Sequence, residues 1–203
     1  MKPYKLLLGF AVATLTLFNA AAEAQTTMMR VRGTVTGLDG QTLALKTRDG
    51  KDVKIKLADN FGVVGVVAAS MAQIQPNSFV GIASMKGKDG RQVALEVLVF
   101  PESARGSNEG HYPWDLQPES MMTNATVAAN VDSNNGRELT LNYKGGQQQI
   151  VVPAGIPIVT FSSGDRALLV PGAAVFVPAQ VAADGSMSAG RVLVGKDGTK
   201  PPM

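Results

Sequence analysis

Apolar and polar residues alternate with a period of two through much of the chain. The pattern is clearest over 31–35, 43–46 and 53–57, where Val, Leu or Ile occupies most alternate positions. Such alternation is typical of β-strands with one face buried and the other in water. The dipeptides Asp39-Gly40 and Asp49-Gly50 separate these segments, and Asp-Gly is a strong signal for a tight turn. The pattern predicts a three-stranded meander.

The chain also repeats itself, as two diverged copies of a unit of about 75 residues. The matches at a constant offset of 95 include Ile55 with Ile150, Pro76 with Pro171, Val80 with Val175, and Val97 with Val192. Two copies favour a tandem pair of domains over a solenoid, which needs at least three repeats.

After the meander, each copy is expected to form one short helix and two more strands. Ser70 is placed as an N-cap before 71–74, and Asp165 takes that role in the second copy. In the first copy, the last two strands are expected over 78–84 and 92–100. Three strands, a short helix and two strands is the element order of an OB-like barrel. We therefore expect an all-β chain with two tandem OB-like barrels. Another small antiparallel barrel or sandwich stays open, because periodicity does not give strand order.

The N-terminal segment has the three parts of a secretory signal peptide. Lys2 and Lys5 precede an apolar stretch over 6–17, and Ala22-Glu23-Ala24 presents small residues for cleavage after Ala24. No later apolar run is long enough to span a bilayer as a helix. The predicted parts are a signal peptide (1–24), a first domain (28–100), an aromatic linker (101–120), a second domain (121–197) and a flexible tail (198–203). The expected location is the periplasm.

Composition excludes several kinds of site. The chain has no Cys and a single His, so disulfides, thiolate metal sites, catalytic thiols and paired imidazoles are ruled out. A net charge of +3, with 17% charged residues, does not indicate a polyanion-binding protein. No P-loop, Gly-x-Ser-x-Gly or His-Glu-x-x-His motif occurs. We expect no cofactor and no enzymatic activity, although a carboxylate site without a sequence signature stays open.

The linker holds the most distinctive residues, because the only His (His111) and the only Trp (Trp114) lie three positions apart. We expect Tyr112 and Trp114 to pack the linker into a groove between the barrels, since aromatic rings bury large areas. On this interpretation His111 and Asp115 form hydrogen bonds there, and all four are candidate binding residues. The alternative is a divalent cation held by Glu109, His111 and Asp115.

Two other groups of residues admit a functional interpretation. The thioethers of 28–29 and 121–122 are soft ligands for Cu(I), but adjacent strand residues point to opposite faces, which favours core positions. A basic strip lies on the outer side of the meander and comprises Arg32, Lys46, Arg48, Lys54 and Lys56. No aromatic residue occurs over 30–57, which favours a solvated face over a nucleic-acid site.

Several motifs resemble a known family. Val31-Arg32-Gly33-Thr34-Val35, Thr47-Arg48-Asp49-Gly50 and Leu57-Ala58-Asp59-Asn60 are similar to the exported bacterial domain-of-unknown-function family 5666, which is described as OB-like and has no assigned activity. Gly110-His111-Tyr112-Pro113-Trp114-Asp115 resembles two-domain exported proteins of soil and plant-associated proteobacteria. Some of these carry the label metal ABC transporter permease, but a permease needs several spanning helices. The resemblance implies an OB-like fold and brings no catalytic residues.

These observations favour an exported, non-enzymatic binding or adaptor protein. Its partner is expected to be another envelope protein or an extended ligand in the groove between the domains, and no nucleic acid. The alternatives are a metal-handling accessory protein that uses the linker residues and a weak enzyme.

Overall fold

The computed structural model describes residues 27–133 and 136–201. The predicted signal peptide and its cleavage after Ala24 lie outside the described residues, as do the last two residues of the tail. The described chain is all-β, with twelve strands and three single-turn 3-10 helices. Within these ranges, no helix is long and apolar enough to cross a membrane.

The predicted strands of the first copy are present. They are β1 (Thr27–Asp39), β2 (Thr42–Thr47), β3 (Asp52–Ala68), β4 (Phe79–Lys86) and β5 (Gln92–Val99). The second copy contributes β7 (Met121–Ser133), β8 (Gly136–Tyr143), β9 (Gly146–Pro153), β10 (Ile158–Ser163), β11 (Ala174–Val181) and β12 (Met187–Gly195). The linker adds β6 (Gly110–Pro113) and η2 (Glu102–Ala104).

The short helices also stand where the caps predict them. They are the 3-10 turns η1 (Met71–Gln73) and η3 (Arg166–Leu168). Before η1, the Ser70 N–H donates to the Gln73 side chain at 2.8 Å. Before η3, the Asp165 carboxylate accepts a hydrogen bond from the Ala167 N–H at 2.8 Å. Each cap satisfies a backbone group that the short turn leaves unpaired.

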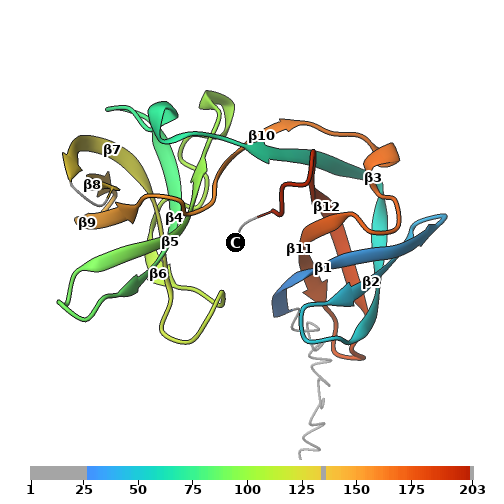
Figure 1. The fold of residues 1–203 in the computed structure, drawn as a ribbon. Coiled ribbons are helices and arrows are strands. Elements are labelled where there is room, and N and C mark those ends of the chain that lie inside the picture. Colours follow the sequence, from blue (N-terminus) through green and yellow to red (C-terminus); the bar gives the residue numbers. More distant parts are fainter. Residues whose placement is uncertain (1–26, 134–135, 202–203) are drawn as a thin grey trace, which may run out of the picture.

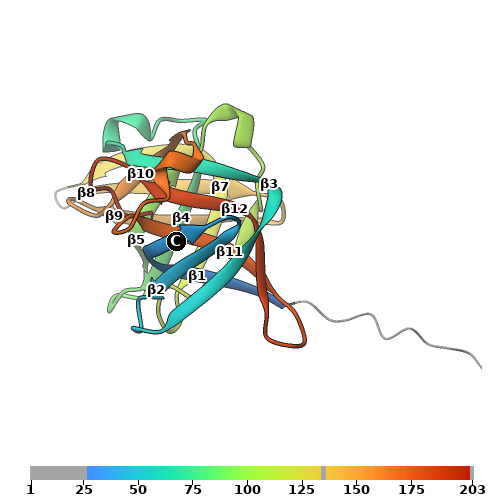
Figure 2. The same ribbon diagram turned by 90° about the vertical axis from the view of Figure 1, so that its right-hand side faces the viewer.

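Five strands close into a first barrel, which takes strands from both copies. β1, β2 and β3 form the antiparallel meander, and β11 pairs with β1 from the other side. β12 pairs with β11 and lies parallel to β3, which closes the ring. Figure 1 shows this barrel on the right, and Figure 2 turns it toward the viewer.

A second ring forms from the remaining strands in the same pattern. β7, β8 and β9 make a meander, β4 pairs antiparallel with β7, and β5 pairs with β4. A short parallel pairing of Gln92-Val93 in β5 with Ile150-Val151 in β9 completes it. We call this ring the second barrel; β6 adds to the edge of β7 beside it.

The pairing does not confirm two tandem domains. The five strands within 28–100 do not pair into one ring: β1 to β3 meet β11 and β12, whereas β4 and β5 meet β7 and β9. The physical reason lies in β3, which runs for 17 residues without a turn. At about 3.3 Å per residue it spans roughly 55 Å, which carries the chain from one barrel to the other.

The hydrophobic cores show the same exchange. The first core joins Leu43, Leu45, Ile55 and Leu57 of the first copy to Val175, Val177 and Val192 of the second. The second core joins Val80, Ile82 and Val97 of the first copy to Val127, Leu139, Leu141 and Ile150 of the second. The alternation therefore predicted the inward faces correctly, but each inward face meets strands of the other copy.

The two copies cross at a pairing of β3 with β10. There Val66 lies opposite Phe161, and these two positions are related by the repeat offset of 95. The parallel pairings on either side follow the same relation. Val63 pairs with Val192, and the positions that the offset of 95 relates to them, Ile158 and Val97, also pair with each other. A third buried cluster at this crossing contains Val66, Leu98, Val159, Phe176 and Leu193. The barrels are thus related by a pseudo-two-fold axis and share a packed joint.

Candidate functional site

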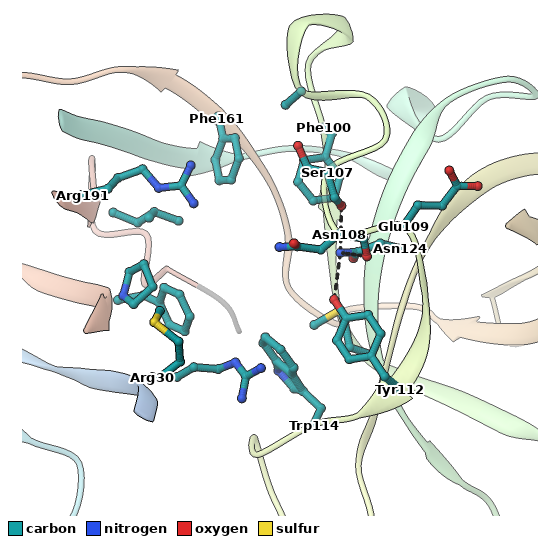
Figure 3. Close-up of a pocket in the computed structure, with 16 residues that line it drawn as sticks. Arg30, Phe100, Ser107, Asn108, Glu109, Tyr112, Trp114, Asn124, Phe161 and Arg191 are labelled. Atoms are coloured by element: carbon teal, nitrogen blue, oxygen red, sulfur yellow. Dashed lines mark hydrogen bonds between the residues drawn. The ribbon is translucent and has the colours of Figure 1, made fainter. Parts of the chain in front are cut away.

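A groove of about 710 Å³ lies between the barrels. Its lining comes from β1, β11 and β12 of the first barrel, from β7 and β10, and from the linker segment that follows β5. Phe100, Phe161 and Phe176 form apolar walls. Arg30 and Arg191 supply positive charge and face Phe100 and Trp114 across the groove (Figure 3). Volume and lining are in the ordinary range of small-molecule sites, which are mostly apolar with a few polar groups.

One wall is the outward face of β1, β11 and β12. Val31 and Val192 point into the first core, so their neighbours Arg30, Arg191 and Leu193 point outward. On β11, Phe176 and Pro178 lie opposite Arg32 and Arg30 in the register with β1. Phe176 and Leu193 are nevertheless only 6% and 2% exposed, because the joint covers them. The wall therefore passes from a buried apolar end to an open cationic edge.

The opposite wall is built by the linker, which covers the matching face of the second barrel. β6 pairs with the start of β7, and His111 and Tyr112 lie opposite Thr123 and Met122. The Asn124 Nδ2 group lies 3.1 Å from the carbonyl oxygens of Ser107 and Asn108 and 3.1 Å from the Tyr112 hydroxyl. Asn124 therefore fixes the loop that holds Tyr112 in the groove wall.

The repeat relates one position of this wall to a tightly packed position of the second barrel. The pair Gly81 and Asn124 of the second barrel corresponds to the pair Phe176 and Arg32 of the first. A Cβ added to Gly81 would lie 2.7 Å from the Asn124 side chain and 3.0 Å from the Phe100 ring. The second barrel thus carries a glycine where Asn124 and Phe100 leave no room for a side chain, and the first barrel carries Phe176 at the corresponding position.

The linker also reaches across to the first barrel. The Arg30 guanidinium carbon lies 3.9 Å from the centroid of the Trp114 ring, in cation–π geometry. Arg32 donates to the Asp115 carboxylate at 2.8 Å, and Arg30 lies 3.7 Å from it. The Trp114 Nε1 atom is buried and has no hydrogen-bond partner among the described residues. Trp114 and Asp115 thus dock the linker on the arginines of β1.

The electrostatics of this contact favour the ionised carboxylate. Burial alone would raise the pKa of Asp115, but the hydrogen bond from Arg32 and the charges of Arg32 and Arg30 bring it below its ordinary value. Burial raises the pKa of the Tyr112 hydroxyl, which the charge of Arg30 partly offsets. At neutral pH, Asp115 is therefore a carboxylate and Tyr112 a neutral hydrogen-bonding group.

His111 lies outside the groove lining and packs on the second barrel. Its Nδ1 atom is 2.8 Å from the Thr123 hydroxyl, and its ring stacks on Tyr143 with centroids 6.2 Å apart. Burial lowers the pKa of His111 below its ordinary value of 6.5. Of the four binding candidates, Tyr112 and Trp114 line the groove, while Asp115 supports Trp114 and His111 anchors β6.

The structure does not bring the proposed metal ligands together. The Glu109 carboxylate accepts a hydrogen bond from the Lys144 N–H at 2.9 Å, whereas His111 meets Thr123 and Asp115 meets Arg32. Within 27–133 and 136–201, no group of three His, Asp or Glu residues could hold an ion. These three residues are separated because each is held by a different element: Glu109 by the turn after β8, His111 by β7 and Asp115 by β1.

The other two groups of residues have mixed outcomes. Met122 is buried as predicted, but Met28 and Met29 are 57% and 45% exposed, so the expectation of core positions is wrong for that pair. The lysines of the basic strip are solvent-exposed. Its member Arg32 instead turns to the linker, where it contacts Asp115.

Comparison of the chain with protein-family models, with curated proteins and with solved structures finds no match.

Sequence reasoning missed most of the groove, including both of its arginines. Arg30 and Arg191 each stand next to a core valine, so alternation marks them as outward-facing. Nothing in the sequence indicates that they share one wall, because that depends on β11 and β12 joining the meander of the other copy.

Proposed function

We propose that this chain is an exported, non-enzymatic binding protein whose ligand lies in the groove between two OB-like barrels. The order β1-β2-β3-β12-β11-β1, with β3 and β12 parallel, supports the OB-like assignment of the first ring. The second ring has the same order, and its parallel pair is β9 with β5. Export rests on the signal-peptide pattern of residues 1–24.

One observation supports a binding role above all: the groove is a built cavity of about 710 Å³ with aromatic walls on both sides. Phe100 and Phe161 meet edge to face, with ring centroids 5.8 Å apart, which fixes one end of the groove. Tyr112 and Trp114 meet at 6.1 Å on the linker side. Because the rings are held by one another, the cavity is shaped before a ligand enters it.

The single tryptophan provides a direct test, because Trp114 lines the groove and no other indole contributes to emission. The test titrates the mature protein with N-phenyl-1-naphthylamine, a neutral apolar probe that brightens when it leaves water. We expect saturable brightening together with loss of Trp114 emission by energy transfer.

A matched pair of variants locates the probe. Ser107→Phe places a ring at an exposed position of the groove lining, whereas Ser103→Phe places one at an exposed position of η2, in the same linker but outside the lining. We expect Ser107→Phe to weaken binding by about tenfold and Ser103→Phe by less than about twofold. Equal affinities in the two variants, or no saturable binding to the parent protein, would overturn the proposed function.

A further inference from the structure

The groove has an excess of positive charge on its first-barrel wall. Arg30 and Arg32 share the Asp115 carboxylate. The Arg191 side chain, by contrast, forms no hydrogen bond or ion pair with the residues that the structure describes. In Figure 3, the side chains of Arg191 and Arg30 both extend from the first barrel toward the groove, one above the other. Since a guanidinium carries five N–H donors in a planar fork, Arg191 presents an unused anion-binding group.

The acidic residue of the lining does not neutralise this wall. The Glu109 carboxylate accepts a hydrogen bond from the Lys144 N–H, and Figure 3 shows it directed away from both arginines. The remaining polar groups of the lining are neutral, namely Ser107, Asn108, Tyr112 and Asn124. The open part of the groove is therefore cationic on one side and neutral on the other.

The linker shows which chemistry this wall accepts. Trp114 places an aromatic face on Arg30, and the adjacent Asp115 places a carboxylate on Arg32. An apolar ring joined to an anionic group thus satisfies two arginines of the wall. Arg191 lies on the same outward face, beside Leu193 and Phe176, and has no such partner among the described residues.

We propose that the groove binds a small organic anion, in which a carboxylate, sulfonate or phosphate group is attached to an apolar body. The anionic group pairs with Arg191 and with the edge of Arg30, while the apolar body lies against Phe100, Phe161 and Phe176. This inference rests on the proposed function, because it names the ligand class of the same groove. A charge-assisted pair with a planar guanidinium adds both affinity and orientation.

Two probes that share one body test the proposal. They are 1-anilinonaphthalene-8-sulfonate, which is anionic, and neutral N-phenyl-1-naphthylamine, which lacks the sulfonate. We expect Arg191→Gln to weaken binding of the sulfonate probe by about tenfold and of the neutral probe by less than about twofold. Arg191→Lys should restore part of the affinity, because it returns the charge without the planar fork. Arg191 is exposed and unpaired among the described residues, so both variants are expected to fold.

Arg48→Gln is the matched control, since it removes an exposed arginine outside the groove. Either of two outcomes would overturn the anion proposal and leave the proposed function standing. The first is that the sulfonate probe binds Arg191→Gln as tightly as it binds Arg48→Gln. The second is that the parent protein binds the sulfonate probe no more tightly than it binds the neutral probe. If neither probe binds the parent protein, both fall.

Discussion

At the scale of single residues, the linker acts through a few directed contacts. Asn124 holds the loop, Asp115 meets Arg32, and Trp114 lies under Arg30. His111 has a different task, because it stacks on Tyr143 and meets Thr123 away from the groove. The two unique residues of the linker thus anchor it to opposite barrels.

The lowered pKa of His111 makes stability depend on pH. The unfolded chain takes up a proton near pH 6.5, whereas the folded chain does so only at lower pH. Folding therefore favours the neutral ring, and the free energy of unfolding falls as pH drops from above 6.5 toward the lowered pKa. The dependence on pH should be smaller in His111→Phe, which keeps the ring on Tyr143 and cannot titrate.

NMR can measure this directly, because the chain has one imidazole and hence one set of ring signals. Urea unfolding of the parent protein and of His111→Phe at several pH values gives the slope of the free energy of unfolding against pH for each protein. Slopes rather than absolute values are compared, since the variant also loses the contact with Thr123. A measured pKa at or above 6.5, or parallel slopes, would contradict the expectation.

At the scale of elements, the exchange of strands governs how the halves are held together. The main pairings that join the halves are β1–β11, β3–β12, β4–β7, β5–β9, β3–β10 and β5–β10. If each copy closed its own barrel, the linker would be the principal connection between them. In the exchanged arrangement, the linker is one connection among many.

Cutting the linker distinguishes the two arrangements. Gly106 and Ser107 are exposed, so a recognition site for a specific protease can be inserted between them. We expect the cleaved chain to elute from a sizing column at the position of the uncut insertion variant, and to separate only in denaturant. Fragments that separate under native conditions would indicate that each copy closes its own barrel.

At the scale of the whole molecule, the two cores and the joint are coupled. Leu98 of β5 and Leu193 of β12 belong to different barrels, yet both are buried in the crossing cluster with Val66. Opening one barrel would therefore expose side chains of this cluster that also pack against strands of the other barrel. Two barrels that share strands and a buried joint should unfold together.

We therefore expect a single unfolding transition, with coincident curves from Trp114 fluorescence and far-UV circular dichroism. Leu98→Ala should lower the free energy of unfolding by about 2–5 kcal/mol and keep the transition single. Val131→Ala, at a position 65% exposed, should change it by less than about 0.5 kcal/mol. Two separated transitions would show that the barrels unfold independently. So would a destabilisation by Leu98→Ala that is seen by fluorescence or by circular dichroism but not by both.

The sequence determined the strands, their inward faces and the repeat, because those features depend on neighbours two positions apart and on turn residues such as Asp39-Gly40. It also predicted that Tyr112 and Trp114 pack at the joint, because they are large aromatic residues in the linker between the two copies. The sequence did not indicate which strands pair with one another. The alternation of apolar and polar residues along β11 is the same whether that strand lies beside β1 or beside β7. Only the tertiary structure decided that the long β3 crosses between barrels. That crossing brings Arg30 and Arg191, 161 positions apart in the chain, onto one wall.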